Sequence, residues 1–220
     1  MPVPDPDALA QRFRAVYTAA LTDVLDALGL PRQTLPPAIG PLAPGMRVAG
    51  PAFAVEGFPQ PDAAYEPSIR RILTMLGDVP AGAVAVYATH DEDSAQFGEL
   101  SATALAARGC AGIVLDGGCR DTDFIRAQGF PVFTRYCTPQ DSVPRWEARE
   151  WGHAVEIGGV RVATGDYVVG DADGVVAIPA ARVEEVLERA EAVAATENQV
   201  RDAVLQGMAP LEAFDRYGKF

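Results

Sequence analysis

The amino-acid sequence predicts an α/β fold in a single domain spanning residues 1–220. Helical and strand-like patterns alternate through the centre of the chain, which favours a parallel sheet covered by helices. Residues 154–178 instead carry short apolar runs separated by glycine turns, which is typical of an antiparallel meander. The chain has 220 residues, 49% of them hydrophobic, so it can bury a sizeable core.

The N-terminal segment, residues 1–45, predicts a helix followed by a proline-rich arm. Apolar residues recur at steps of three and four from residue 7 to residue 29, where a glycine and then a proline end the pattern. Five prolines and two glycines between residues 31 and 45 disfavour a regular element, so we expect an extended arm or a surface loop. A strand is expected at residues 48–55 and a proline-rich loop at residues 57–67.

The middle of the chain predicts alternating helices and strands. We expect helices at residues 69–76, 98–108 and 122–128, and buried strands at residues 84–88, 112–115 and 131–133. Asp116, Gly117 and Gly118 follow the second of these strands and predict a turn. The alternation indicates that the strands pair in parallel.

The last third predicts a hairpin, two further strands and a long helix. The hairpin turns at Gly158-Gly159. Its strands are expected at residues 154–157 and 160–162, with the later strands at residues 167–169 and 175–178. Residues 180–205 predict a helix with one apolar stripe and a glutamate-rich solvated side, within a C-terminal helical extension of residues 180–220.

Charge and composition exclude several classes of partner. The formal net charge is −12, and such an acidic chain repels the phosphates of nucleic acids. No apolar run approaches the roughly 18 residues of a membrane span, and the N-terminus lacks a signal-peptide pattern. The three cysteines predict neither a disulfide framework nor a thiolate zinc site. We therefore expect a cytoplasmic protein with no nucleic-acid or membrane partner.

Two junctions in the central unit contain side chains suited to chemistry. The residues from Gly98 through Glu99 and Leu100 to Ser101 open a helix, whose first N–H groups can bind a carboxylate. Arg120 and Asp121 follow a strand, where the guanidinium can contact an anion through two N–H groups and the carboxylate can bind a hard cation. The alternative is a helix cap with a surface ion pair.

Several motifs give this chain a resemblance to a known family, the RraA-like aldolases. An acidic residue, twenty intervening residues and then Arg-Asp form that family's active-site pattern, and Glu99 and Arg120-Asp121 stand at this separation. The likeness extends from about residue 17 to residue 207. The motifs are Phe97-Gly98-Glu99-Leu100, Ala107-Arg108-Gly109, Gly112–Gly118, Arg120-Asp121 and Gly170–Pro179. The resemblance implies a layered α/β/β/α core of the swivelling β/β/α type with N- and C-terminal helices.

The resemblance also implies a role for each site residue. Asp121 would bind a divalent cation, Mg²⁺ or Mn²⁺, and Arg120 would contact the pyruvate part of the substrate and stabilise its enolate. Gly98, Glu99, Leu100 and Ser101 would form the carboxylate-binding segment. Glu99 would also hold a water that transfers protons. The family usually has Asp at this position, so Glu99 departs from its pattern by one methylene.

Residues from an adjacent subunit are expected to complete the metal's outer shell. Asp26 matches the N-terminal acidic residue of this group, where the aldolases have Glu, and Glu197 resembles the C-terminal one. Each is otherwise interpreted as a solvated helix carboxylate. The family forms trimers and hexamers, so the resemblance implies a homotrimer or homohexamer with a site between subunits.

The implied activity is that of a class II pyruvate aldolase, a carbon–carbon lyase. It would cleave 4-hydroxy-2-oxo acids of the 4-hydroxy-4-methyl-2-oxoglutarate type to pyruvate and decarboxylate oxaloacetate as a side reaction. Lys219 is the chain's only lysine, which argues against an aldolase that uses a Schiff base. Two alternatives remain: an RraA-type protein that binds and regulates a ribonuclease without aldolase catalysis, and an enzyme for an unrelated small keto acid.

Overall fold

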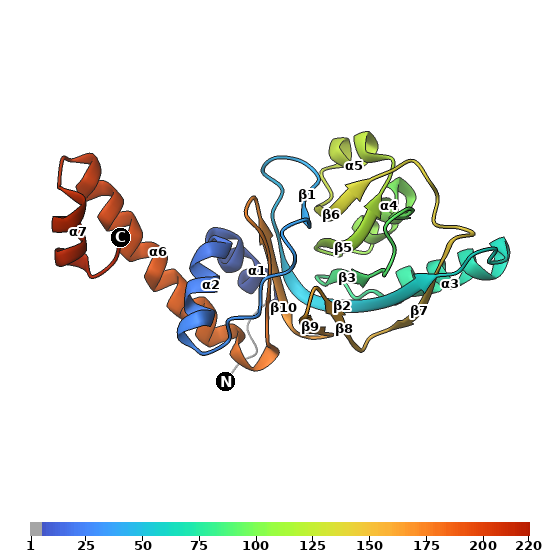
Figure 1. Cartoon of the computed structure of the whole chain (residues 1–220), viewed down its shortest axis with the longest axis horizontal. Coiled ribbons are helices and arrows are strands. Elements are labelled where there is room, and N and C mark those ends of the chain that lie inside the picture. The colour runs from blue at the N-terminus through green and yellow to red at the C-terminus, as the bar shows by residue number, and fades with distance from the viewer. Residues whose placement is uncertain (1–5) are drawn as a thin grey trace.

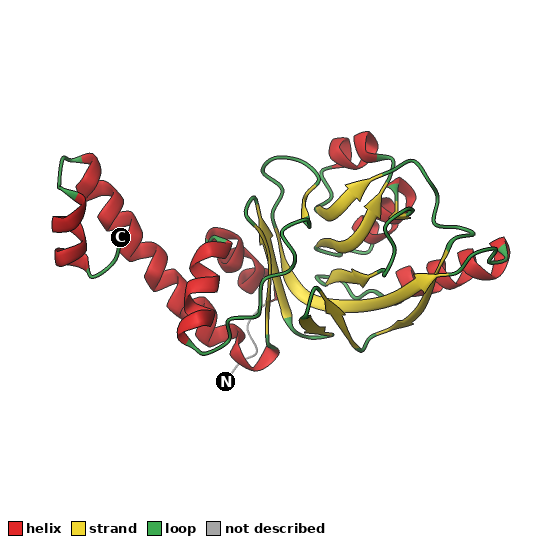
Figure 2. Ribbon diagram, viewed as in Figure 1, coloured by secondary structure: helices red, strands yellow, loops and turns green. Residues whose placement is uncertain are grey.

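A nine-stranded sheet organises the structure, a computed structural model that describes residues 6–220 (Figures 1 and 2). Its strand order is β1-β6-β5-β3-β2-β10-β11, with β4 beside β5 and β7 beside β2. A separate two-stranded sheet pairs β8 with β9. The strands are β1 (Gly40–Pro41), β2 (Val48–Pro59), β3 (Val84–Ala88), β4 (Ala95–Phe97), β5 (Gly112–Cys119), β6 (Val132–Cys137), β7 (Trp146–Trp151), β8 (Ala154–Ile157), β9 (Val160–Ala163), β10 (Tyr167–Asp171) and β11 (Gly174–Ile178).

The helices form two groups at opposite ends of the structure (Figure 1). One group contains α1, α2 and α6, which pack against the β10 and β11 end of the sheet, with α7 following α6. The other contains α3, α4 and α5, which cover the parallel strands. The helices are α1 (Pro6–Ala15), α2 (Thr18–Ala27), α3 (Tyr65–Asp78), α4 (Glu99–Ala107), α5 (Thr122–Gln128), α6 (Val183–Leu205) and α7 (Pro210–Tyr217), and a short 3-10 helix (Ala180–Arg182) precedes α6.

The predicted parallel core is confirmed. Strands β2, β3, β5 and β6 pair in parallel, and every residue of β3 is buried. Val86 pairs with Val114 on one face and Tyr87 with Leu115 on the other, so apolar side chains of neighbouring strands stack on both faces of the sheet. The predicted hairpin of β8 and β9 and the antiparallel pair of β10 and β11 are also present.

The long strand β2 joins the two halves of the sheet. It pairs in parallel with β3, and it pairs antiparallel with β10 near its start and with β7 near its end. The expected proline-rich loop at residues 57–67 is therefore wrong at both ends, because its first three residues extend β2 to Pro59 and its last three begin α3 at Tyr65. Gly57 permits this pairing, because a Cβ there would lie 2.0 Å from the buried indole ring of Trp146.

Three other expectations need correction. The helix expected at residues 7–29 is two helices, α1 and α2, which are separated at Val16 and Tyr17. Asp116, Gly117 and Gly118 form the middle of β5 instead of a turn. Strands β4 and β7 have no counterpart in the sequence-based assignment, whereas α7 falls within the expected helical extension of residues 180–220.

The proline-rich arm lies against its own chain. Leu35 and Ile39 are buried in the same apolar cluster as Val48 and Val175, and Thr34 forms an isolated bridge with Val176. The absence of a regular element over most of residues 31–45 agrees with the expectation of an extended arm. Within residues 6–220, no helix is long and apolar enough to cross a lipid bilayer.

Candidate active site

Strand pairing brings the two predicted junctions together. Strand β4 runs parallel to β5, with Phe97 opposite Cys119, so the residues that follow these two strands are neighbours. The backbone N–H of Arg120 donates to the carbonyl oxygen of Phe97 at 2.9 Å. Gly98 is the residue before α4, and Asp121 is the residue before α5. The site therefore forms at the carboxyl ends of parallel strands, where α/β sheets bind ligands.

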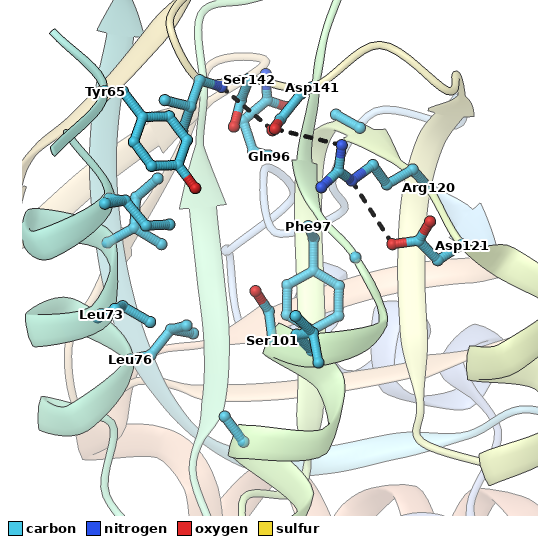
Figure 3. A pocket seen from close by; sticks show the side chains of 17 residues that line it. Tyr65, Leu73, Leu76, Gln96, Phe97, Ser101, Arg120, Asp121, Asp141 and Ser142 are labelled. Atoms are coloured by element: carbon cyan, nitrogen blue, oxygen red, sulfur yellow. Dashed lines mark hydrogen bonds and ion pairs between the residues drawn. The ribbon is translucent and has the colours of Figure 1, made fainter.

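A pocket of about 230 Å³ lies between α3 and the N-terminus of α4 (Figure 3). Arg120 and Asp121 lie on one side of it, and α3 forms the opposite side. The remaining wall comes from β4, α4 and the loop after β6. The lining residues are Tyr65, Ile69, Ile72, Leu73, Leu76, Ala95, Gln96, Phe97, Gly98, Leu100, Ser101, Ala104, Arg120, Asp121, Asp141, Ser142 and Val143.

Arg120 lies between two carboxylates. Its Nε is 3.6 Å from Oδ2 of Asp121, and its Nη1 is 3.4 Å from Oδ2 of Asp141 (Figure 3). Both separations exceed the usual length of a charge-assisted hydrogen bond, so neither carboxylate fully engages the guanidinium. The side chain of Arg120 is 35% exposed. It is therefore held in orientation while its N–H groups stay available to an anion in the pocket.

Asp121 and Gly98 approach each other closely. A Cβ at residue 98 would lie 2.6 Å from Oδ2 of Asp121, and that oxygen also accepts the backbone N–H of Glu99 at 3.3 Å. Asp121 has a φ of 55°, in the left-handed region that residues other than glycine seldom adopt. Glycine at 98 lets the start of α4, whose first N–H groups have no partner within the helix, lie directly against the carboxylate of Asp121.

A buried polar network holds the adjacent strand ends in place. Asp91 is buried and accepts hydrogen bonds from the Ser94 hydroxyl and from Nε2 of Gln96, the latter at 2.6 Å. Gln96 in turn accepts the N–H of Gly118 at 3.0 Å through its Oε1. Gln96 also lines the pocket. The network fixes β4 against β5 at the point where the site residues emerge.

Cys119 lies directly before the site residues but is buried. Burial raises the pKa of its thiol to about 12. A thiol with such a pKa is protonated at neutral pH and is a poor nucleophile. Cys119 is therefore a packing residue of β5.

The Glu99 carboxylate has a partner on its own helix. Its Oε1 accepts a hydrogen bond from the hydroxyl of Thr103 at 2.9 Å, one turn further along α4. Glu99 is absent from the residues that line the pocket, although its backbone N–H contacts Asp121. The expected role of this carboxylate in proton transfer therefore stays a prediction.

Asp26 and Glu197 lie at the other end of the structure from the pocket. Asp26 is exposed on α2, and Glu197 is on α6, whereas the pocket lies between α3 and α4 (Figure 1). Lys219 forms ion pairs of 3.0 Å with both Glu197 and Asp23. Within one copy of the chain, then, Asp26 and Glu197 are not part of the pocket.

The pocket suits a weakly held divalent cation. Among residues 6–220, no three His, Cys, Asp or Glu side chains gather in a way that could hold a metal ion. Mg²⁺, however, commonly binds through one or two carboxylates and completes its shell with water and substrate. Asp121 supplies such a carboxylate, with a side chain 43% exposed. The two carboxylates of the lining outnumber its one guanidinium, which gives the pocket a net attraction for cations.

The comparison with protein families identifies the chain. The model described as RraA-like, Aldolase/RraA, matches residues 18–177. The chain belongs to the RraA-like family. This match agrees with the resemblance found in the sequence motifs and with the mixed α/β fold described above.

Two named relatives are similar to this RraA-like chain over more than nine-tenths of its length. A protein of Halalkalibacterium halodurans named as a candidate 4-hydroxy-4-methyl-2-oxoglutarate aldolase is 29% identical over 92% of this chain and 91% of its own length. Protein DlpA of Legionella pneumophila is 28% identical over 95% of this chain. The chain spans about a third of the length of DlpA (34%).

A solved structure links the same fold to a regulator. RraAS2 of Streptomyces coelicolor, described as an unusual member of the RNase ES inhibitor RraA protein family, superposes with a TM-score of 0.79 at 27% identity. The superposition covers 91% of this chain and 98% of RraAS2. The RraA-like fold therefore accompanies more than one function, and the site chemistry must decide between them.

The sequence-predicted residues divide into three groups. Gly98, Leu100, Ser101, Arg120 and Asp121 meet in the pocket, Glu99 lies beside it, and Asp26 and Glu197 lie elsewhere. Sequence reasoning missed Asp141, Gln96 and the side chains of α3 that line the pocket. Asp141 comes from a loop that carries no motif. The apolar face of α3 was visible as a helical pattern but gave no indication that it faces a site.

Proposed function

We propose that this chain is a class II pyruvate aldolase, a lyase that cleaves 4-hydroxy-2-oxo acids to pyruvate with the help of a divalent cation. 4-Hydroxy-4-methyl-2-oxoglutarate belongs to this substrate class. The observation that carries the proposal is the convergence of the Arg120 guanidinium and the N-terminus of α4 on one pocket beside the Asp121 carboxylate. The pocket thus combines two kinds of anion-binding group with one cation-binding group.

Each group matches one part of a 2-oxo acid. The N–H groups of Leu100 and Ser101, at the start of α4, would bind the substrate carboxylate. The guanidinium of Arg120 would contact the 2-oxo oxygen, and its positive charge would stabilise the enolate that forms there. A Mg²⁺ or Mn²⁺ ion held by Asp121 would supply a further electrophile for this negative charge.

Bond cleavage requires two proton movements. The 4-hydroxyl loses its proton and the C3–C4 bond breaks, which leaves an enolate of pyruvate and a carbonyl product. C3 then gains a proton and pyruvate is released. A water held by Glu99 would transfer these protons, which requires the carboxylate to exchange its bond to Thr103 for one to water. Oxaloacetate would lose CO₂ through the same enolate, as a side reaction.

The proposed enzyme is a homotrimer or homohexamer. Asp26 and Glu197 lie outside the pocket of their own chain, so they contribute to a site only if they reach the pocket of an adjacent copy. In that arrangement they would hold waters around the cation. A monomeric form would then be inactive.

A regulator without catalysis is the competing function. The similarity to RraAS2 favours it, because that protein is described as belonging to a ribonuclease-inhibitor family. Capture of this chain by a ribonuclease domain, with loss of that ribonuclease's activity, would support regulation. Pyruvate release would support the lyase.

The deciding experiment measures pyruvate release from three substrates. These are 4-hydroxy-4-methyl-2-oxoglutarate, 4-hydroxy-2-oxopentanoate and oxaloacetate, each with Mg²⁺ and with EDTA. We expect turnover that EDTA abolishes and that Asp121→Ala lowers by at least about a hundredfold. Asp123→Ala is the matched control, because this aspartate is fully exposed on α5. Turnover that persists in EDTA would refute the role of the metal, and no turnover would refute the lyase.

A further inference from the structure

The side of the pocket opposite Arg120 is entirely apolar apart from one phenol. It consists of five side chains that α3 presents at helical spacing (Figure 3). Ile72 and Leu76 are buried at its base, and Leu73 and Tyr65 lie at its rim. The five residues are Tyr65, Ile69, Ile72, Leu73 and Leu76. We call this surface the α3 wall.

The rim of the α3 wall is unusually exposed for apolar side chains. Leu73 is 59% exposed and Tyr65 is 66% exposed. Leu100, which faces them from the start of α4, is 79% exposed. Exposed apolar side chains that cluster around a pocket commonly mark a ligand-binding surface, because a ligand can cover them.

The pocket has a single positively charged side chain with which to bind an anionic ligand. Arg120 is the only positively charged residue in its lining, and Asp121 and Asp141 are negatively charged. The nearby arginines have other partners: Arg70 pairs with Glu66, Arg71 bonds the backbone of β7, and Arg145 bonds the carbonyl oxygen of Asp141. A ligand carboxylate directed away from Arg120 would therefore meet apolar side chains without a counter-charge.

We propose that, within the proposed class of 2-oxo acids, this site prefers substrates with a single carboxylate, whose C4 substituent is apolar and packs on the α3 wall, over dicarboxylates such as 4-hydroxy-4-methyl-2-oxoglutarate. The inference rests on the proposed function for the orientation of the substrate, with its carboxylate and 2-oxo group at Arg120 and α4. An alkyl or aryl substituent would cover Leu73 and Tyr65. A second carboxylate at the same position would lose its hydration without gaining a partner.

Binding of two ligands that cannot be cleaved tests this preference without requiring catalysis. 4-Phenyl-2-oxobutanoate and 2-oxoglutarate share the 2-oxo acid end and lack a 4-hydroxyl, but one ends in a phenyl ring and the other in a carboxylate. Calorimetric titration of the full chain with Mg²⁺ should give a Kd about tenfold lower for the phenyl ligand. Equal affinities, or tighter binding of 2-oxoglutarate, would overturn the inference and leave the proposed function intact. If neither ligand binds the protein, both this inference and the proposed function fail.

A pair of variants on α3 tests the location of the substituent. Leu73→Arg places a cation on the α3 wall and should shift the ratio of the two Kd values by about tenfold toward 2-oxoglutarate. Thr74→Arg adds the same charge to the same helix at an exposed position that does not line the pocket, and it should leave the ratio unchanged. Equal effects of the two variants would show that the substituent does not lie on the α3 wall.

Discussion

Gly98 and Asp121 are packed so closely that residue 98 has no room for a side chain. A Cβ there would lie 2.6 Å from Oδ2 of Asp121 and 3.2 Å from Cγ of Arg120. The backbone of Gly98 is extended, with a φ of −147°, so any residue could adopt its conformation. Glycine is needed here for the close approach of two site residues, and this gives the first prediction a clear cause.

Gly98→Ala should impair the site and leave the fold intact. The methyl group would displace the carboxylate of Asp121 and the stem of Arg120 by a rotation of their side chains. Misplacement on the order of 1 Å commonly lowers turnover by about a hundredfold. We expect that loss in pyruvate release, with a melting temperature close to that of the unmodified chain. Gly77→Ala in α3 is the control, because no atom lies within 4 Å of a Cβ there. A full rate in Gly98→Ala would contradict the assigned geometry.

Arg120→Lys should lower pyruvate release although it keeps the positive charge. A lysine ammonium lacks the fork of N–H groups with which Arg120 can face Asp121, Asp141 and a bound anion together. Loss of such a preorganised donor costs about a hundredfold in rate. Arg126→Lys provides the comparison, since Arg126 is a partly exposed arginine of α5 outside the pocket. Similar rates for the two variants would mean that charge alone suffices at position 120.

The ion pair between Arg12 and Glu191 should make stability depend on pH. Arg12 donates two hydrogen bonds to Glu191, at 2.7 and 2.8 Å, and these bonds lower the pKa of the Glu191 carboxyl from its ordinary value of 4.5. The pair's stabilisation is therefore fully present above pH 4.5 and is lost as the pH falls through the lowered pKa. Because both side chains are largely exposed, it should amount to less than about 1 kcal/mol.

Urea unfolding checks this dependence. Glu191→Gln should unfold at a lower urea concentration than the unmodified chain at pH 7, and the difference should shrink at pH 3. Glu188→Gln, which removes an exposed carboxylate of α6 that forms no hydrogen bond with Arg12, should have a smaller effect at pH 7. A difference that is the same at both pH values would indicate that packing, and not charge, accounts for the effect.

The three cysteines should differ in reactivity. Cys137 is exposed, whereas Cys110 and Cys119 are buried, and burial raises the pKa of both buried thiols. A single thiol per chain should therefore react with iodoacetamide in the folded protein at pH 8. Mass spectrometry of the digested product should locate the label at Cys137, while urea should expose all three. Rapid labelling of Cys119 without denaturant would contradict this prediction and show that the end of β5 is exposed to solvent in the folded protein.

The local elements that follow apolar periodicity could be predicted from sequence. Strand β3 has the bounds that the pattern indicates, and α5 begins and ends where its threonine and glycine suggest. The central parallel pairing followed from the alternation of helices and strands. Such elements depend on local pattern and burial, which a sequence records directly.

Elements defined by distant partners could not be predicted. The break between α1 and α2 depends on Asp171, which accepts hydrogen bonds from the N–H and hydroxyl of Thr18 at 2.8 and 2.7 Å. Gly117 and Gly118 suggested a turn, but they lie in a strand. Glycine is needed at both positions because Gln96 and Tyr136 leave no space for side chains there. These contacts join residues more than 15 positions apart, beyond the reach of any local pattern.

The candidate site was predictable in part for the same reason. The Arg120-Asp121 motif and the α4 junction are short and follow strands, so pattern and spacing located them. The α3 wall and Asp141 reach the pocket only through tertiary packing. Most of the polar half of the site could thus be predicted from the sequence, while the half that would select a substrate's tail became visible only in the fold.

The path of β2 determines how the protein can be divided. This one strand supplies hydrogen bonds to β3 along one edge and, along the other, to β10 near its start and to β7 near its end. A cut within β2 would leave each fragment with an unpaired sheet edge, and edges of that kind promote aggregation. We therefore expect neither half to be recoverable as a stable, protease-resistant fragment. Complementation from two separate pieces, or insertion of a reporter domain, would have to use the loops outside this strand.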